Sequence, residues 1–267
     1  MLGLIAYVFT QDGAMAGLKH YLVPDFSQIT NPKLIVSAMG QAFFSMSLGV
    51  GTMLVYGSYI RADENLPVVG ALVTLTDMSV AFLAGLLVLP AIFVAQELGV
   101  PIYAESGDLI AGPNLIFQVL PALFQNMGAT GLFVSFAFFV LMSIAAVTSS
   151  ISMLEVPVSY AVEAHQVGRN KATWLIGLIV LGISTVICLN FDLLFGYVAD
   201  ISTQVAQPLL SMMLCIFTGW IFYRNSILQE LKNGSPDVEQ GLFWKIWPTY
   251  VKFFCPLLIV ITFAQGF

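Results

Sequence analysis

The stretch Gln41-Ala-Phe-Phe-Ser-Met-Ser-Leu-Gly-Val-Gly51 lies in the middle of an uncharged run, residues 34–60. A membrane-spanning helix needs about 20 apolar residues at about 1.5 Å each, so this run predicts one crossing centred on Ser47. Polar side chains at that depth are costly, and each glycine lowers helix propensity by about 1 kcal/mol relative to alanine. We therefore predict a helix broken near Gly49-Val50-Gly51, with close packing of small residues as the alternative.

A break at this depth has a chemical use. Unpaired backbone is tolerated inside a membrane only where it faces protein or a water-filled cavity. Broken helices of this kind present carbonyl groups to cations and a half-helix N-terminus to a substrate anion. The stretch therefore indicates a binding site inside the membrane.

The composition agrees with a membrane protein. The chain has 267 residues, of which 58% are apolar and only 9% charged, whereas soluble domains carry about 25% charged residues. That excludes a disordered chain and a cytosolic globule, and the net charge of −6 offers no basic face to nucleic acid. The three cysteines lack metal or redox spacing, which predicts small buried side chains.

Charge gaps locate the remaining elements and predict an all-α, polytopic membrane protein. We expect a helix stub at 1–10, an outer loop at 11–33 and the broken helix at 34–60. The expected elements after it are helices 67–98, 130–162, 172–190, 196–224 and 245–266, with an outer loop of short helices at 99–129 and a cytoplasmic loop at 225–244.

The positions of lysine and arginine give the orientation, because basic residues are enriched in cytoplasmic loops. If the 34–60 helix runs from outside to inside, only Lys19 and Lys33 lie outside. The cytoplasmic residues are then Arg61, Arg169, Lys171, Arg224, Lys232, Lys245 and Lys252.

A second polar cluster lies in the 130–162 helix. Ala145, Thr148 and Ser149 stand at i, i+3 and i+4 and share one face. Two hydroxyls and a carbonyl are hard oxygen ligands that suit a small alkali cation, and Met153, one turn further, can line an apolar pocket. The alternative is ordinary: Ser and Thr in membrane helices often bond the i−4 carbonyl.

Two acids lie within or near the predicted hydrocarbon, where acids usually serve function. Asp77 is ten residues into its helix and has no Lys or Arg within 15 residues on either side. For Glu155, function and a structural hydrogen bond both stay open. An intramembrane hydrolase is not expected, because His20 and His165 fall in predicted loops; the chain is not predicted to be an enzyme.

The stretch from Gln41 through Tyr56-Gly-Ser-Tyr-Ile-Arg61 resembles the sixth helix of the neurotransmitter:sodium symporters, which have the LeuT-type fold. Ala145 to Glu155 resembles their eighth helix, Asp77 to Gly85 their seventh, and Gly112 to Pro121 their fourth outer loop. The resemblance implies a sodium-coupled amino-acid symporter in the cell (plasma or inner) membrane, made of the second inverted repeat plus one further helix.

The resemblance also implies residue roles. Ser45 and Asp77 bind a first sodium ion, and Ala145 (through its carbonyl), Thr148 and Ser149 form half of a second sodium site. Phe44 also caps the pocket, and Asp200 is similar to an outer-gate acid. The residues implied to line the pocket of a neutral or hydrophobic amino acid are Phe44, Ser45, Ser47, Gly49, Val50, Ser149 and Met153.

Two departures from the family pattern carry predictions. Chloride-dependent relatives have Asn where Asp77 stands and Ser where this chain has Ala81, so we expect chloride-independent transport. The chain also begins at what resembles the tail of the fifth helix. We expect that helices one to five are needed as a partner half and that this chain alone does not transport. An alternative is a truncated membrane protein that acts only as an interaction or scaffold partner.

Overall fold

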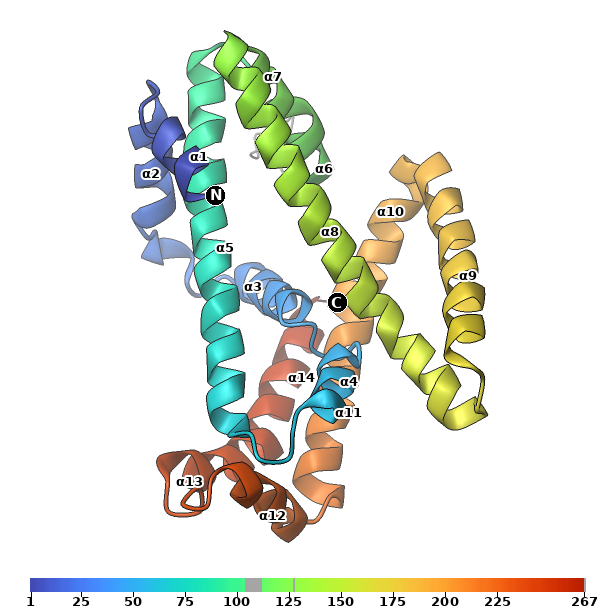
Figure 1. Ribbon diagram of the computed structural model, residues 1–267. Coiled ribbons are helices and arrows are strands. Elements are labelled where there is room, and N and C mark those ends of the chain that lie inside the picture. The colour runs from blue at the N-terminus through green and yellow to red at the C-terminus, as the bar shows by residue number, and fades with distance from the viewer. Residues whose placement is uncertain (104–111, 127, 267) are drawn as a thin grey trace. The chain divides into compact units, whose positions relative to one another are not determined.

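The computed structural model describes residues 1–103, 112–126 and 128–266, and the elements in these ranges are helices (Figure 1). Their bounds are α1 Leu2–Val8, α2 Ala14–Leu22, α3 Pro32–Ser45, α4 Thr52–Tyr59, α5 Leu66–Glu97, α6 Gly112–Asn114, α7 Leu120–Asn126, α8 Gly128–His165, α9 Arg169–Leu189, α10 Phe191–Asp200, α11 Gln207–Ile216, α12 Arg224–Gly234, α13 Leu242–Thr249 and α14 Cys255–Gly266.

Shorter pieces connect several of these helices. A 3₁₀ turn, η1, covers Phe26–Gln28. Four π-helical segments continue the neighbouring α-helices: η2 Leu115–Val119, η3 Ile201–Ala206, η4 Phe217–Ile221 and η5 Tyr250–Phe254. As a result, α10 to η4 form one long helix, and so do α13 to α14.

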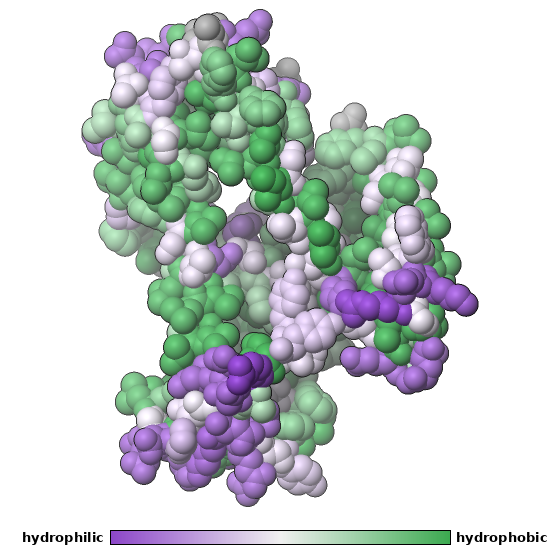
Figure 2. Space-filling view, in the orientation of Figure 1, coloured by the Kyte–Doolittle hydropathy of each residue, from purple (hydrophilic) through white to green (hydrophobic). Residues whose placement is uncertain are grey.

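Five helices in the described ranges are long and apolar enough to cross a membrane: Leu66–Glu97, Thr130–His165, Arg169–Leu189, Leu193–Ile221 and Leu242–Ile261. The 34–60 crossing differs, because it consists of α3 and α4, of 14 and 8 residues. In Figure 2, hydrophobic side chains cover much of the visible helix surface and hydrophilic ones gather toward the helix ends. The molecule is therefore a multi-pass membrane protein.

The chain forms two compact units. Unit 1 comprises residues 1–26 and 75–148, and unit 2 comprises residues 27–74 and 149–267. In unit 1, α1 and α2 pack along the second half of α5 (Figure 1). Gly17 permits this contact, since a Cβ there would lie 2.6 Å from Cα of Pro90.

Unit 2 is built around α3, α11 and α14, which contact one another, and α9 packs against α10. A smaller apolar cluster joins α12 to α13, with Leu231, Val238 and Trp244 buried at its centre. Ile227 and Leu228 pack against this cluster and fix α12 beside α13.

Two segments expected to be loops contain helices. Residues 11–33 include α2, whose Ala14 and Gly17 are buried within unit 1 against α5. His20 in α2 and His165, the last residue of α8, therefore lie in helices and not in loops. Residues 225–244 include most of α12, whose helix-forming residues place Ile227, Leu228 and Leu231 on one face.

The other helix bounds shift by a few residues. The 196–224 helix begins at Phe191 and ends at Ile221, because Phe222 is extended. The last crossing begins at Leu242, three residues earlier than expected. In the predicted 99–129 loop, residues 104–111 and 127 lie outside the described residues, and α6, η2 and α7 are its short helices.

Candidate functional site

The predicted break in the 34–60 helix is confirmed. α3 ends at Ser45 and α4 begins at Thr52. Between them, Ser47, Gly49 and Gly51 have φ values of 51°, 79° and 84°, which a right-handed helix cannot contain. Glycine adopts this region without a steric penalty, whereas Ser47 is held there at a cost of about 1–2 kcal/mol.

The break brings two helix ends of opposite polarity together. Met46 N–H donates to the Ala42 carbonyl and Leu48 N–H donates to that of Phe43, at 3.1 and 2.9 Å, and these bonds close the end of α3. α4 starts after Gly51 without a side-chain cap. Helix termini carry about half an elementary charge, negative at the C-terminus and positive at the N-terminus. The break can therefore hold a cation beside α3 and an anion beside α4.

The backbone of the break lies directly against α11. Gly49 is buried, and a Cβ built on it would lie 2.3 Å from the carbonyl oxygen of Gln207 and 2.8 Å from Ser211 Oγ. Only a residue without a side chain fits at this position. Gly49 therefore serves the close approach of two helices as well as the left-handed turn.

Three buried polar residues beside this contact were not predicted from the sequence. Thr52, Gln207 and Ser211 are 3%, 3% and 7% exposed. Thr52 Oγ1, Gln207 Oε1 and Ser211 Oγ have no hydrogen-bond partner within the described part of the chain. The available signal was the i, i+4 spacing of Gln207 and Ser211 within the uncharged 201–223 run.

α4 is attached to α8 by hydroxyl groups. Tyr56 bonds to Ser152, and Tyr59 donates to Glu155 Oε1 at 2.6 Å. A Cβ on Gly51 would lie 3.0 Å from a methyl group of Val156. These contacts place the C-terminal side of the break beside the second half of α8.

Glu155 is the centre of a polar network within unit 2. Its Oε1 accepts hydrogen bonds from Tyr59, from Ser159 at 3.0 Å and from Arg169 at 2.6 Å. Glu155 thus joins α4, α8 and the first residue of α9. Of the two roles left open for Glu155, function and a structural hydrogen bond, the structure shows the hydrogen bond.

The second polar cluster has the geometry expected of one helix face. Thr148 Oγ1 donates to the Ile144 and Ala145 carbonyls, at 3.0 and 2.9 Å. This is the bond to the preceding turn that Thr commonly makes in a membrane helix. Because the hydroxyl proton points toward the backbone, the oxygen lone pairs point outward and can coordinate a cation. Thr148 and Ser149 are both exposed.

The predicted pocket residues come from two elements of unit 2, the broken helix and α8. Phe44 is 47% exposed at the end of α3, and Met153 is 44% exposed on α8. Ser45, Ser47 and Val50 are partly buried at the break. Phe44 and Met153 thus leave nearly half of their surface exposed.

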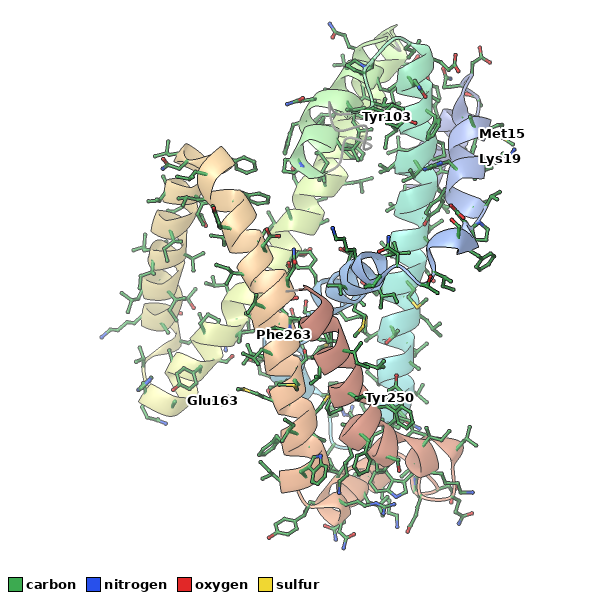
Figure 3. All side chains as sticks on the ribbon, turned by 180° about the vertical axis from the view of Figure 1, so that it is seen from behind. Met15, Lys19, Tyr103, Glu163, Tyr250 and Phe263 are labelled. Carbon is green, nitrogen blue, oxygen red and sulfur yellow. The ribbon has the colours of Figure 1, made fainter. Side chains whose placement is uncertain are left out.

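A cavity of about 960 Å³ lies beside Phe44 within unit 2. Asp200, the predicted outer-gate acid, also lines it, and its Oδ1 accepts a hydrogen bond from Gln204 Nε2 at 2.8 Å. Phe263, labelled on α14 in Figure 3, is a further lining residue. Phe44 and Asp200 therefore border one cavity, and their role in a gate stays a prediction.

The predicted first sodium site combines Ser45 of unit 2 with Asp77 of unit 1. Because its two residues belong to different units, this site stays a prediction. Among the described residues, no group of three or more His, Cys, Asp or Glu side chains could hold a metal ion.

Comparisons with known proteins place the chain in a family. The model of the sodium:neurotransmitter symporter family matches residues 1–267. The chain belongs to this family of transporters. It is therefore a transporter-family chain and not an enzyme, as the sequence predicted.

Individual relatives agree with this assignment. The chain is 32% identical to an uncharacterised sodium-dependent transporter of Bacillus subtilis over 98% of its length, and 33% identical to one of Haemophilus influenzae over 100%. The crystal structure of MhsT in complex with L-phenylalanine is similar with a TM-score of 0.85 and 33% identity, over 99% of this chain and 59% of MhsT. The LeuT-type fold is therefore confirmed. The chain spans 57% of the length of each of the two relatives.

Proposed function

We propose that this chain forms the second half of the binding site of a sodium-coupled symporter for a neutral or hydrophobic amino acid. The observation that carries the proposal is the break between α3 and α4, where a negative and a positive helix end meet. An amino acid carries an ammonium group, which a negative helix end attracts, and a carboxylate, which a positive helix end attracts. The break therefore suits a zwitterion.

The substrate side chain would lie against apolar surface. Phe44, Val50 and Met153 supply it, and no acidic or basic residue is among the proposed pocket residues. MhsT, which shares the fold, was crystallised with L-phenylalanine. We therefore propose phenylalanine and leucine as the first substrates to test.

Sodium coupling would use two sites. Ser45 and Asp77 would contribute to the first, and Ala145, Thr148 and Ser149 to the second. These groups offer few oxygen atoms to each ion, so other segments must complete both shells. For this reason we propose that residues 1–267 alone do not transport and that helices one to five of the family supply the other half.

The decisive experiment measures sodium-driven uptake of labelled phenylalanine and leucine into proteoliposomes, using the protein as its gene encodes it. Thr148→Val and Ser149→Ala should each raise the sodium concentration for half-maximal uptake at least about tenfold, a loss of about 1.4 kcal/mol in sodium binding. Ser143→Ala is the matched control, because Ser143 is also exposed on α8 and bonded to an i−4 carbonyl. Uptake that needs no sodium refutes the proposal.

The same preparation tests chain 1–267 by itself. Uptake by this chain alone would contradict the need for a partner half. If it shows no uptake with or without helices one to five of a relative, the scaffold alternative is favoured.

Chloride independence is a separate part of the proposal. A carboxylate at Asp77 can offset the charge of sodium, which chloride does in other family members. Uptake should therefore be equal in chloride and gluconate buffers, and Asp77→Asn should lose rate or become sensitive to chloride. A strong chloride requirement in the wild type would overturn this part.

A further inference from the structure

A second, smaller cavity of about 210 Å³ lies in unit 2, where η4, α12, α13 and η5 meet. Six of the described residues that line it are basic or aromatic, among them Arg224, Trp244, Trp247 and Lys252, and Thr249 adds a hydroxyl group. No acidic residue is among the described residues that line it.

Two membrane-length segments, Leu193–Ile221 and Leu242–Ile261, meet at this cavity. One membrane-length segment ends at Ile221, one residue after Trp220. The Trp220 indole donates to the Lys252 carbonyl at 3.2 Å, and Gly219 lies close enough to Lys252 that a Cβ would be 2.9 Å from its Cα. Lys252, which lies within the membrane-length segment Leu242–Ile261, is thereby held level with the end of Leu193–Ile221.

The surroundings of the cavity match that position. Around α12 and α13, hydrophilic side chains gather at one end of unit 2 (Figure 2). Tyr250, labelled in Figure 3, begins η5 on the same side of the unit. The long helix that ends with η4 leads to the cavity, and the hydrophilic helix α12 borders it.

The two positive charges of the cavity rest on aromatic rings. Lys252 Nζ is 4.3 Å from the ring centre of Trp220 and 5.6 Å from that of Phe253, and Arg224 Cζ is 5.3 Å from that of Trp244. Such contacts hold a long cationic side chain in place without neutralising it. Trp244 is itself buried, so the ring beneath the Arg224 guanidinium is held in place by its surroundings.

Neither cation is paired with an acid. Among the described residues, no carboxylate lies within 4.0 Å of Arg224 or Lys252; the basic residue of α12 that is paired is Lys232, with Glu239. Two uncompensated cations beside one cavity, at the edge of a low-dielectric phase, favour an anion between them.

We propose that this cavity binds the phosphate headgroup of an anionic phospholipid. Arg224 would take two phosphate oxygens through its planar fork, Lys252 would act as a point charge, and the Thr249 hydroxyl would donate to a remaining oxygen. Lipid is the favoured source of the phosphate because the cavity lies between two membrane-length segments, at the end of one of them, where acyl chains can reach it. This inference does not depend on transport.

The test measures lipid binding to the intact protein by native mass spectrometry and by titration in detergent, with phosphatidylglycerol and phosphatidylcholine as probes. Phosphatidylglycerol should bind more tightly. Arg224→Gln with Lys252→Gln should weaken it about 30-fold, since each basic residue near a membrane surface contributes roughly fivefold. Lys245→Gln is the matched control, because Lys245 is an exposed cation of α13 that does not line the cavity.

A charge-conserving variant and a competition experiment separate the alternatives. The conservative change Arg224→Lys with Lys252→Arg keeps both charges and should retain phosphatidylglycerol within a few-fold. Equal loss in this variant would assign the effect to packing and overturn the proposal. Inorganic phosphate in excess should not displace the lipid; displacement would show a site for free phosphate instead. Equal binding of both lipids, or no effect of the double change, also refutes it.

Discussion

Gly49→Ala is the most direct test of how the break is built. Alanine in the left-handed region costs about 1–2 kcal/mol. Its methyl group would also meet the Gln207 carbonyl at 2.3 Å and Ser211 Oγ at 2.8 Å, and overpacking of this kind costs about 1–3 kcal/mol. Because the nearest atom is backbone, α11 or the break must move. The expected loss of stability is therefore about 2–5 kcal/mol.

Thermal unfolding of the purified protein in detergent measures this loss. At about 2–4 °C for each kcal/mol, the midpoint should fall by roughly 4–20 °C. Gly57→Ala is the control within α4, since its Cβ meets no heavy atom within 4 Å and its φ is not left-handed; alanine there should be neutral or stabilising. If both variants unfold at the same temperature, the close approach of Gly49 to α11 is wrong.

Two further predictions concern contacts elsewhere. Glu155→Gln removes the charge that binds Arg169 and Tyr59 and should lower the unfolding free energy by about 1–2 kcal/mol. The control is Asp63→Asn, in an exposed pair with Arg61, which should change the unfolding free energy by less than about 1 kcal/mol. Equal effects of the two variants would contradict the network around Glu155. Gly17→Ala should speed hydrogen exchange in α2, because its methyl group would meet the Pro90 backbone, while Gly3→Ala, in open space, should not; unchanged exchange would contradict this packing.

The sequence predicted the features that depend on local composition. The break was visible because two glycines and two serines stand in mid-span, where lipid gives them no other use. The face shared by Ala145, Thr148 and Ser149 followed from helix periodicity alone. The fold class followed from charge gaps and, for its topology, from the family resemblance.

What the sequence did not predict depends on contacts between distant residues. Gln207 and Ser211 matter because Gly49 lies against them, about 160 positions earlier in the chain. Likewise, α2 is a packed helix because Gly17 lies against Pro90. The sequence alone predicted a loop there, since α2 is short and contains Lys19 and His20. Periodicity describes one element at a time, so such partners are not apparent from it.

The π-helical segments have a consequence for how the chain tolerates length changes. A π turn accommodates about one residue more than an α turn, so η3, η4 and η5 each let a membrane helix absorb a single inserted residue while remaining continuous. Evolutionary insertions and deletions of one amino acid should therefore gather at Ile201–Ala206, Phe217–Ile221 and Tyr250–Phe254. Deleting one residue from η4 before Trp220 would rotate Trp220 by about 100° relative to α11 and take its indole away from Lys252. The length of η4 therefore determines whether Trp220 and Lys252 are in contact.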